Sequence, residues 1–389
     1  MKRTTGRYEK SSVTGETVAA FMPYPLPPAA PPLILDDTLS ELLRKAEHHL
    51  ARLELAGEMV PSLDWFIYGF VRKEAVISSQ IEGTQASLID LLTFEATDRT
   101  GEPLKTDVEE VCNYIDALKY ARDELRRKRG LPLSMRLLRE THKRLMKGVR
   151  GGDKQPGVVR RSQNWIGGTR PGNAVYVPPP PQALAELLGA LEKYIHSDDA
   201  LPLLVRAGLL HAQFETIHPF LDGNGRLGRL LVTLALEHWG LLTQPLLYLS
   251  LFFKRHRAEY YRVLNQIRIE GDWESWTAFF LEGVAAIAEE AAGVGRDLFE
   301  LVSRDRERLL VRPDSTVISL RLFERLPVKP IITAANVVAQ LETTKPTAMK
   351  ALNLLVEAEI LSEITGKKRD QTFGYSAYLE RLRIGTDIE

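Results

Sequence analysis

The chain has 389 residues, with 51 Lys or Arg against 51 Asp or Glu, so its formal net charge is zero. This balance gives no indication of nucleic-acid or membrane binding, and no apolar run is long enough to span a bilayer. A single cysteine, Cys112, excludes an internal disulfide and fits a reducing compartment. Because no apolar segment follows the charged N-terminus, we expect a cytoplasmic protein of two or three domains.

Residues 1–36 are rich in proline, with Pro25, Pro27 and Pro28 followed by Pro31-Pro32. Proline at this density predicts an extended or polyproline arm rather than packed helix or sheet. We expect the arm to lie across its own domain; docking to a proline-reading module is the alternative.

Residues 37–148 predict a helical region, because apolar residues recur there at helical spacing. One helix should run from about 64 to 83, with Gly83 as the residue that ends it. Glu82 would then lie in the last turn, where the helix dipole disfavours an anion. A cation elsewhere would offset this, and Arg229 is a candidate; a solvated carboxylate is the alternative.

Residues 149–305 form the next predicted unit, which opens with a glycine-rich stretch at about 157–181. Within it, 164–166 and 174–177 could be the arms of a short β-hairpin, the alternative being a surface loop. Two later helices are predicted at about 256–270 and 273–303.

The most informative stretch runs from His218 to Arg229 and reads His-Pro-Phe-Leu-Asp-Gly-Asn-Gly-Arg-Leu-Gly-Arg. Its glycines predict a tight turn at 222–225, and apolar spacing predicts a helix over 226–239. Free N–H groups and the dipole at such a helix start favour an anion. Asn-Gly is also typical of surface hairpins, but a hairpin needs strands on both sides.

Chemically suited side chains gather around this predicted helix start. Arg226 and Arg229, three residues apart, share one helix face and lean back towards the turn. His218 has a side chain suited to act as a base near neutral pH. Asp222 is a possible ligand for a hard cation. The combination indicates a nucleotide site.

The twelve residues match H-P-F-x-D-G-N-G-R-x-x-R at every fixed position, and the chain thereby resembles the Fic (Fic/Doc) family, whose members mostly transfer AMP from ATP to a protein hydroxyl. The resemblance implies a mainly α fold with a Fic-type helical core and a small β-hairpin flap. It also implies His218 as base, Asp222 as the Mg²⁺ ligand and a target protein as partner. The nucleotide-binding residues of the motif would be Gly223, Asn224, Gly225, Arg226, Leu227, Gly228 and Arg229.

Within this resemblance, the motif residues have separate roles. The backbone from Gly223 to Gly225 and the Asn224 side chain would hold the α- and β-phosphates. Arg226 would stabilise charge on the departing pyrophosphate, and Arg229 would hold the γ-phosphate. A phosphorylating branch of the family carries lysine where this chain has Gly225, so AMP transfer is favoured.

Two further segments gain meaning from the resemblance. The flap would dock a target segment by adding a strand, with Ile166, Gly167, Gly168 and Thr169 nearest the nucleotide. Tyr260 begins a run similar to the family segment that lines the adenine pocket, although a core role is the alternative.

Ser78-Ser79-Gln80-Ile81-Glu82-Gly83 matches the family's inhibitory motif, [S/T]-x-x-x-E-[G/N]. The resemblance implies that Ser78 and Glu82 belong to an inhibitory helix. Glu82 would pair with Arg229 and obstruct productive placement of the γ-phosphate. Removal of AMP by the same site is a second enzymatic possibility.

Residues 314–389 predict three helices followed by strand, basic turn and strand, an order that resembles a winged-helix α+β domain. A DNA-binding version would use Lys345, Thr347, Lys350, Lys367, Lys368 and Arg369. Ten basic and ten acidic residues cancel in this unit, whereas strong DNA binders are usually basic. Protein contact or homodimer formation is the alternative. The non-enzymatic hypothesis is a DNA-binding regulator that senses nucleotide.

Overall fold

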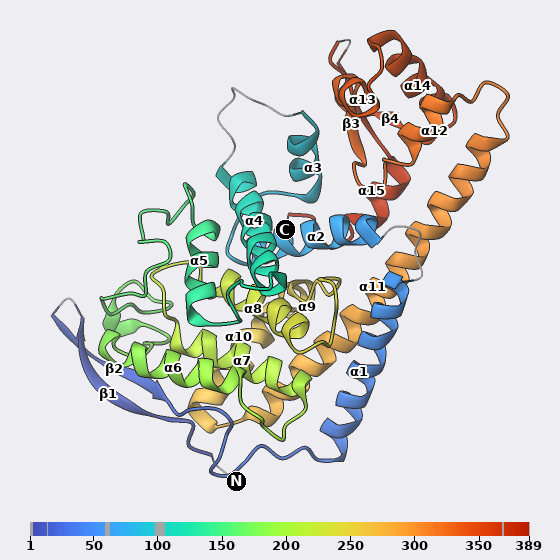
Figure 1. The fold of residues 1–389 in the computed structure, drawn as a ribbon. Helices are drawn as coiled ribbons and strands as arrows, with labels where there is room; N and C mark the ends of the chain where they lie inside the picture. Colours follow the sequence, from blue (N-terminus) through green and yellow to red (C-terminus); the bar gives the residue numbers. More distant parts are fainter. Residues whose placement is uncertain (1–2, 14, 59–62, 98–105, 368, 389) are drawn as a thin grey trace.

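The computed structural model describes residues 3–13, 15–58, 63–97, 106–367 and 369–388. These residues form mostly α-helices with two small antiparallel sheets, which confirms the predicted fold class (Figure 1). Among them, no helix combines the length and apolar character needed to cross a bilayer.

The N-terminal segment forms a β-hairpin of β1 (Gly6–Val13) and β2 (Glu16–Pro23), paired from Gly6↔Pro23 to Val13↔Glu16. The prediction of an arm without sheet is therefore wrong for these residues. The physical reason is that the prolines are concentrated after β2, so the preceding backbone keeps its N–H groups for pairing. The proline stretch itself lies across the domain, because Gln213 Nε2 donates to the Tyr24 carbonyl at 2.9 Å.

Five helices make up the N-terminal helical region. They are α1 (Asp37–Glu58), α2 (Leu63–Ile81), α3 (Leu88–Thr97), α4 (Thr106–Arg126) and α5 (Met135–Leu145). The helix expected at about 64–83 is confirmed as α2, and Gly83 after it has a left-handed φ of 94°. The short helix α3 was not predicted.

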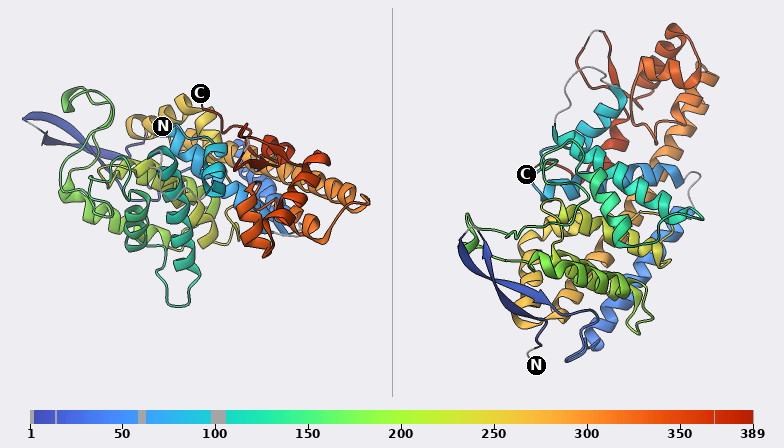
Figure 2. Two further views of the ribbon diagram at one scale, coloured as in Figure 1. Left: turned by 90° about the horizontal axis from the view of Figure 1, so that it is seen from above. Right: turned by 60° about the vertical axis from the view of Figure 1, so that its left-hand side comes forward.

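The next part of the chain carries the His218–Arg229 stretch, which begins directly after one core helix and runs into the first turns of the next. Its elements are the 3₁₀ turns η1 (Pro171–Asn173) and η2 (Pro181–Ala183), then α6 (Leu184–Ile195), α7 (Leu203–Ile217), α8 (Asn224–His238), α9 (Ser250–Arg255), α10 (Arg257–Glu270) and α11 (Trp273–Leu310). The long helix α11 packs along α1 and extends beyond it towards the C-terminal unit (Figures 1 and 2).

The C-terminal unit lies at the far end of α11 (Figure 1). It consists of α12 (Val317–Phe323), β3 (Ile331–Thr333), α13 (Ala334–Leu341), α14 (Lys345–Glu357), β4 (Ser362–Glu363), β5 (Thr372–Gly374) and α15 (Ser376–Leu382). The strands are ordered β3-β5-β4 and are antiparallel. The three predicted helices and the two predicted strands are present, whereas β3 and α15 were not predicted. The winged-helix assignment stays a prediction.

After α15 the chain returns to α2, near which the C-terminus lies (Figure 1). Gln80 Nε2, in the last turn of α2, donates to the backbone carbonyl of Thr386 at 2.8 Å. Lys254 Nζ donates to Gln80 Oε1 at 2.9 Å and to the carbonyl of Asp387 at 2.8 Å. The residues after α15 therefore contact the helix that ends directly before Glu82.

Candidate active site

The loop between α7 and α8 is built around a side-chain bridge. Asn224 Oδ1 accepts from the Phe220 N–H, and Asn224 Nδ2 donates to the Phe220 carbonyl, both at 2.9 Å. Gly223 precedes α8 with a left-handed φ of 76°, a conformation that glycine adopts without strain. Both the oxygen and the nitrogen of the Asn224 amide are therefore bonded to the Phe220 backbone. The predicted contact of this side chain with phosphate stays a prediction.

The same loop is fixed from outside by Arg160, which sequence analysis did not single out. This side chain is buried, and Arg160 Nε donates to the His218 carbonyl at 2.9 Å. Its Nη2 donates to the carbonyl of Pro179 at 2.5 Å, and its backbone N–H donates to Pro219 at 2.9 Å. Arg160 thus joins the loop to both ends of the predicted flap. No local sequence pattern distinguishes it from an ordinary surface arginine.

His142, on α5, is a second clamp that sequence analysis missed. His142 Nε2 donates to the Asp222 carbonyl at 2.9 Å, and Nδ1 accepts from the Gly157 N–H at 2.8 Å. The ring stacks on Phe220 with centroids 3.9 Å apart. Burial lowers the pKa of His142 to about 4, so the ring is neutral, as these two bonds require. Its position four residues after the buried Leu138 was the available signal.

His218 caps the C-terminal end of α7 in a left-handed conformation, with φ 49° and ψ 62°. Its Nδ1 atom is buried without a hydrogen-bond partner among the described residues. Burial, and then the neighbouring charge of Arg160, lower the pKa of His218 to about 4. The imidazole is therefore neutral near pH 7 and able to accept a proton.

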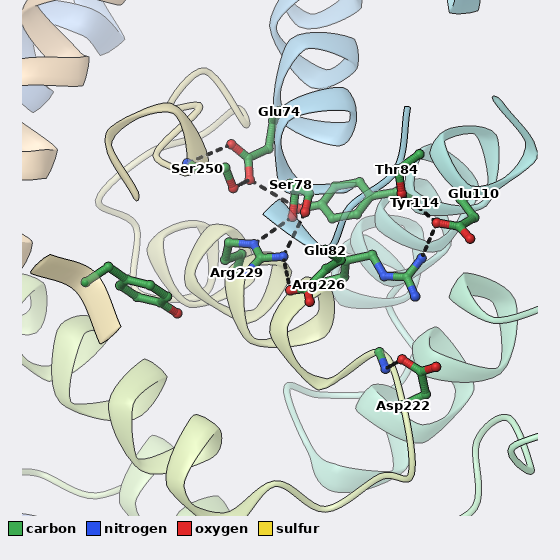
Figure 3. A network of polar contacts seen from close by, with 12 residues as sticks. Glu74, Ser78, Glu82, Thr84, Glu110, Tyr114, Asp222, Arg226, Arg229 and Ser250 are labelled. Carbon is green, nitrogen blue, oxygen red and sulfur yellow. Dashed lines mark hydrogen bonds and ion pairs between the residues drawn. The ribbon is translucent and has the colours of Figure 1, made fainter. Parts of the chain in front are cut away.

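The structure brings Glu82 and Ser78 together with Arg229 (Figure 3). Arg229 Nη2 lies 2.8 Å from Glu82 Oε1, Arg229 Nε donates to Ser78 Oγ at 2.9 Å, and Nη2 also donates to the Ser78 carbonyl at 2.8 Å. The Arg229 side chain is 2% exposed and that of Glu82 is 33% exposed. Burial raises the pKa of Glu82, but the charge and hydrogen bond of Arg229 outweigh it and leave the pKa lowered.

Gly225 lies under the Glu82 carboxylate in the first turn of α8. A Cβ atom at this position would lie 2.2 Å from Glu82 Oε1 and 3.0 Å from Arg229 Nη1. Only glycine therefore permits this approach. The Glu82 carboxylate thus lies at the helix N-terminus, where free N–H groups and the dipole favour an anion.

The other motif side chains have different partners. Arg226 Nη1 lies 3.3 Å from Glu110 Oε2, and both side chains are buried. Asp222 Oδ1 accepts from the Gly223 N–H at 2.6 Å. The described residues contain no cluster of three or more His, Cys, Asp or Glu that could hold a metal. Mg²⁺ commonly takes one or two carboxylates plus phosphate oxygens, so Asp222 with a bound nucleotide fits such a site.

Leu227 and Gly228 lie inside α8, where Leu227 is fully buried and a Cβ on Gly228 would lie 2.4 Å from Glu215 Oε1. These two residues therefore pack the helix against its surroundings. Their predicted part in nucleotide binding stays a prediction.

The predicted flap turns back on itself, but its arms are joined by one β-bridge, Ile166↔Tyr176, rather than by strands. The expectation of strands at 164–166 and 174–177 is therefore wrong. One arm bonds elsewhere, because the Phe21 N–H of β2 donates to the Val177 carbonyl at 2.9 Å. Gly167, Gly168 and Thr169 are exposed at the tip, and their position relative to a nucleotide stays a prediction.

Tyr260 is buried, and its hydroxyl lies 2.9 Å from His211 Nε2. Its ring packs against Phe253, with centroids 4.6 Å apart. This position favours the core alternative, whereas the adjacent Tyr261 is 46% exposed. An adenine contact of Tyr260 stays a prediction.

The residues proposed for DNA contact lie in the C-terminal unit, away from α8 (Figure 1). Lys345, Thr347 and Lys350 are exposed in the first two turns of α14, and Lys367 and Arg369 are exposed between β4 and β5. Lys368 lies outside the described residues. DNA binding stays a prediction.

The helical core and the motif-bearing loop before α8 define a protein of the Fic type. Residues 40–123 match the Fic/DOC family N-terminal domain, and residues 132–236 match the Fic/DOC family domain. Residues 40–236 thus carry both Fic/DOC family domains, almost without interruption.

Curated relatives in the comparison are called protein adenylyltransferase Fic. The protein of this name from Aedes aegypti is 30% identical over 218 residues, which cover 54% of this chain and 40% of the relative. The one from Drosophila grimshawi is 32% identical over 168 residues, covering 43% of this chain and 31% of the relative. The chain thus spans less than half the length of these relatives.

Solved structures share the fold. A Fic family protein from Desulfovibrio desulfuricans G20 has a TM-score of 0.55 at 21% identity, with 89% of this chain and 98% of that chain covered. Fic-1 from C. elegans has a TM-score of 0.51 at 19% identity, with 67% and 73% covered.

Proposed function

We propose that this protein transfers AMP from ATP to a Ser, Thr or Tyr hydroxyl of a target protein, and that Glu82 restrains the reaction. The observation that carries the proposal is the ion pair of Glu82 with Arg229, 2.8 Å long, at the start of the helix that follows the loop and completes the motif. The name of the curated relatives agrees with this activity.

In the proposed reaction the target hydroxyl oxygen attacks the α-phosphorus of ATP, the bond to the bridging oxygen of the β-phosphate breaks, and pyrophosphate leaves. His218, neutral because its pKa is lowered to about 4, takes the hydroxyl proton. The carbonyl clamps of Arg160 and His142 keep the loop that carries this base in place. Mg²⁺, held by Asp222 and phosphate oxygens, would neutralise phosphate charge.

The two motif arginines have permanent charges suited to phosphate oxygens. Backbone N–H groups from Gly223 to Gly225 would receive the α- and β-phosphates, and Arg226 would stabilise charge on the departing pyrophosphate. Arg229 would hold the γ-phosphate. While Glu82 occupies Arg229, that contact is blocked and a triphosphate also meets a like charge.

The test is transfer of label from α-labelled ATP with Mg²⁺, comparing wild type, Glu82→Gly, His218→Ala and the double variant. We expect strong labelling of the protein itself or of lysate proteins by Glu82→Gly, and weak labelling by the other three. The double variant shows whether the released activity depends on His218. If Glu82→Gly is folded, binds ATP and labels nothing, the proposed activity is refuted.

One observation favours a second function, a nucleotide-dependent regulator that binds DNA through residues 314–389. The residues after α15 contact α2 at Gln80, so the end of this unit touches the helix that directly precedes Glu82. DNA binding that responds to ATP, without label transfer, would support it. Removal of AMP by the same site can be assayed with a pre-labelled target. A homodimer and a cytoplasmic location stay predictions.

A further inference from the structure

A buried carboxylate that no motif includes lies beside Arg226. Glu110, on α4, is fully buried, and its Oε2 atom is 3.3 Å from Arg226 Nη1. The same oxygen accepts a hydrogen bond from Thr84 Oγ1 at 2.6 Å. Figure 3 shows the three side chains in a row, with Glu110 between Thr84 and Arg226.

The contacts of Arg226 indicate that Glu110 fixes its direction. Its side chain is 3% exposed, and Glu110 supplies the one carboxylate that pairs with it among the residues that the structure describes. Nη2 donates only to the sulfur of Met146, at 3.3 Å, a weak acceptor. Nε is buried and lacks a partner within the described chain. The guanidinium thus keeps donors for a further acceptor, such as phosphate.

Glu110 also reaches the segment that follows the inhibitory glutamate. Thr84, two residues after Glu82, is 1% exposed, and its backbone N–H donates to the Ser79 carbonyl at 3.2 Å. Arg150 Nε lies 3.5 Å from Glu110 Oε1, while Arg150 Nη2 donates to the Glu82 carbonyl at 3.3 Å. One carboxylate therefore contacts the first motif arginine and the turn after α2.

We propose that Glu110 is the positioning residue of Arg226 and directs its guanidinium towards the nucleotide phosphates. The hydrogen bond from Thr84 fixes the Glu110 carboxylate relative to the end of α2. The proposal rests on the nucleotide site of the proposed function, but not on the transfer step. A buried charge needs a partner, so removing the Glu110 charge leaves Arg226 free to turn towards other acceptors.

The test is a double-variant cycle on ATP affinity, measured by calorimetry in the Glu82→Gly background so that Glu82 cannot become the new partner of Arg226. Glu110→Gln preserves side-chain shape and an acceptor for Thr84 while removing the charge. We expect it to weaken ATP binding by roughly two- to a hundredfold, the range for coupled residues in contact. In chains that also carry Arg226→Ala, the same change should have no further effect.

Glu109→Gln is the matched control, since Glu109 is the adjacent glutamate of α4 and has no hydrogen bond or ion pair among the described contacts; it should leave ATP affinity unchanged. Equal weakening by Glu110→Gln with and without Arg226 would assign Glu110 a structural role and overturn the proposal. No weakening in either background would overturn it as well. If the cycle behaves as expected but Glu82→Gly transfers no AMP, the positioning role stands and the proposed activity fails.

Discussion

Replacing Glu82 by Gln tests how the buried Arg229 is stabilised. Removing one partner of a buried ion pair costs about 3–5 kcal/mol when the other charge is left isolated. Here the cost should be smaller, because Ser78 still accepts two hydrogen bonds from the guanidinium and the Glu82 side chain is 33% exposed. We expect Glu82→Gln to lower the free energy of unfolding by about 1–2 kcal/mol, close to one charged hydrogen bond.

ATP should reverse this loss, because its phosphates supply the anion that Arg229 lacks. Ligand at a hundred times its Kd stabilises a folded protein by about 2.7 kcal/mol. The assay is thermal unfolding with and without ATP, using Glu109→Gln as a charge-matched control. The variant should melt below wild type without ATP and gain more from ATP than wild type does. Equal melting temperatures and equal gains would refute the reasoning.

Three further predictions follow from the packing. Gly225→Ala should weaken ATP binding. The new methyl would lie 2.2 Å from the present position of Glu82 Oε1, where an incoming anion must also approach. Unchanged ATP affinity in calorimetry would contradict this. Gln80→Met removes the hydrogen bonds of Gln80 to Lys254 and to the residues after α15. This variant should speed amide hydrogen exchange at the end of α2 and raise label transfer. Exchange equal to wild type would show that the residues after α15 do not hold the helix. Burial lowers the pKa values of His142 and His211 from 6.5 to about 4. As the pH falls, these two rings therefore bind protons in the unfolded chain before they do so in the folded one. The contribution of each ring to stability should therefore be complete above pH 6.5 and about 2 kcal/mol lower at about pH 5. Because burial raises the pKa of Glu74 and Glu215 to about 7 and so acts in the opposite direction, denaturant titrations at the two pH values should compare the protein with His142→Gln and His211→Gln.

The sequence predicted the parts of the site that depend on local spacing. The turn before α8 follows from its glycines, and the helical content of α2 and α8 follows from apolar periodicity. The family resemblance suggested that Glu82 would lie against Arg229, and the structure places them 2.8 Å apart. Predictions of this kind need only residues close in sequence or a motif shared with relatives.

The residues that sequence analysis missed act through tertiary contacts. Arg160, His142 and Glu110 lie far along the chain from the loop or arginine that each contacts, and none belongs to a repeated pattern. The flap shows the same limit, since the residues before Pro178 bond to β2, more than 150 positions earlier, rather than pairing fully with the opposite arm. Strand pairing between such distant segments cannot be read from local alternation.

The position of the Glu82 carboxylate above Gly225 affects how the site could respond to free nucleotide. In the proposed function, Glu82 is tethered to the chain and would be an intramolecular competitor for the anion position, with an effective concentration on the order of millimolar or more. Free nucleotide would displace the carboxylate only when the ratio of its concentration to its Kd exceeded the equilibrium constant of the Glu82–Arg229 contact. A movement of α2 by a few ångströms, in contrast, would separate Glu82 from Arg229 without any change in nucleotide concentration. Under the proposed function, the position of α2 would therefore control the site more strongly than the supply of its substrate.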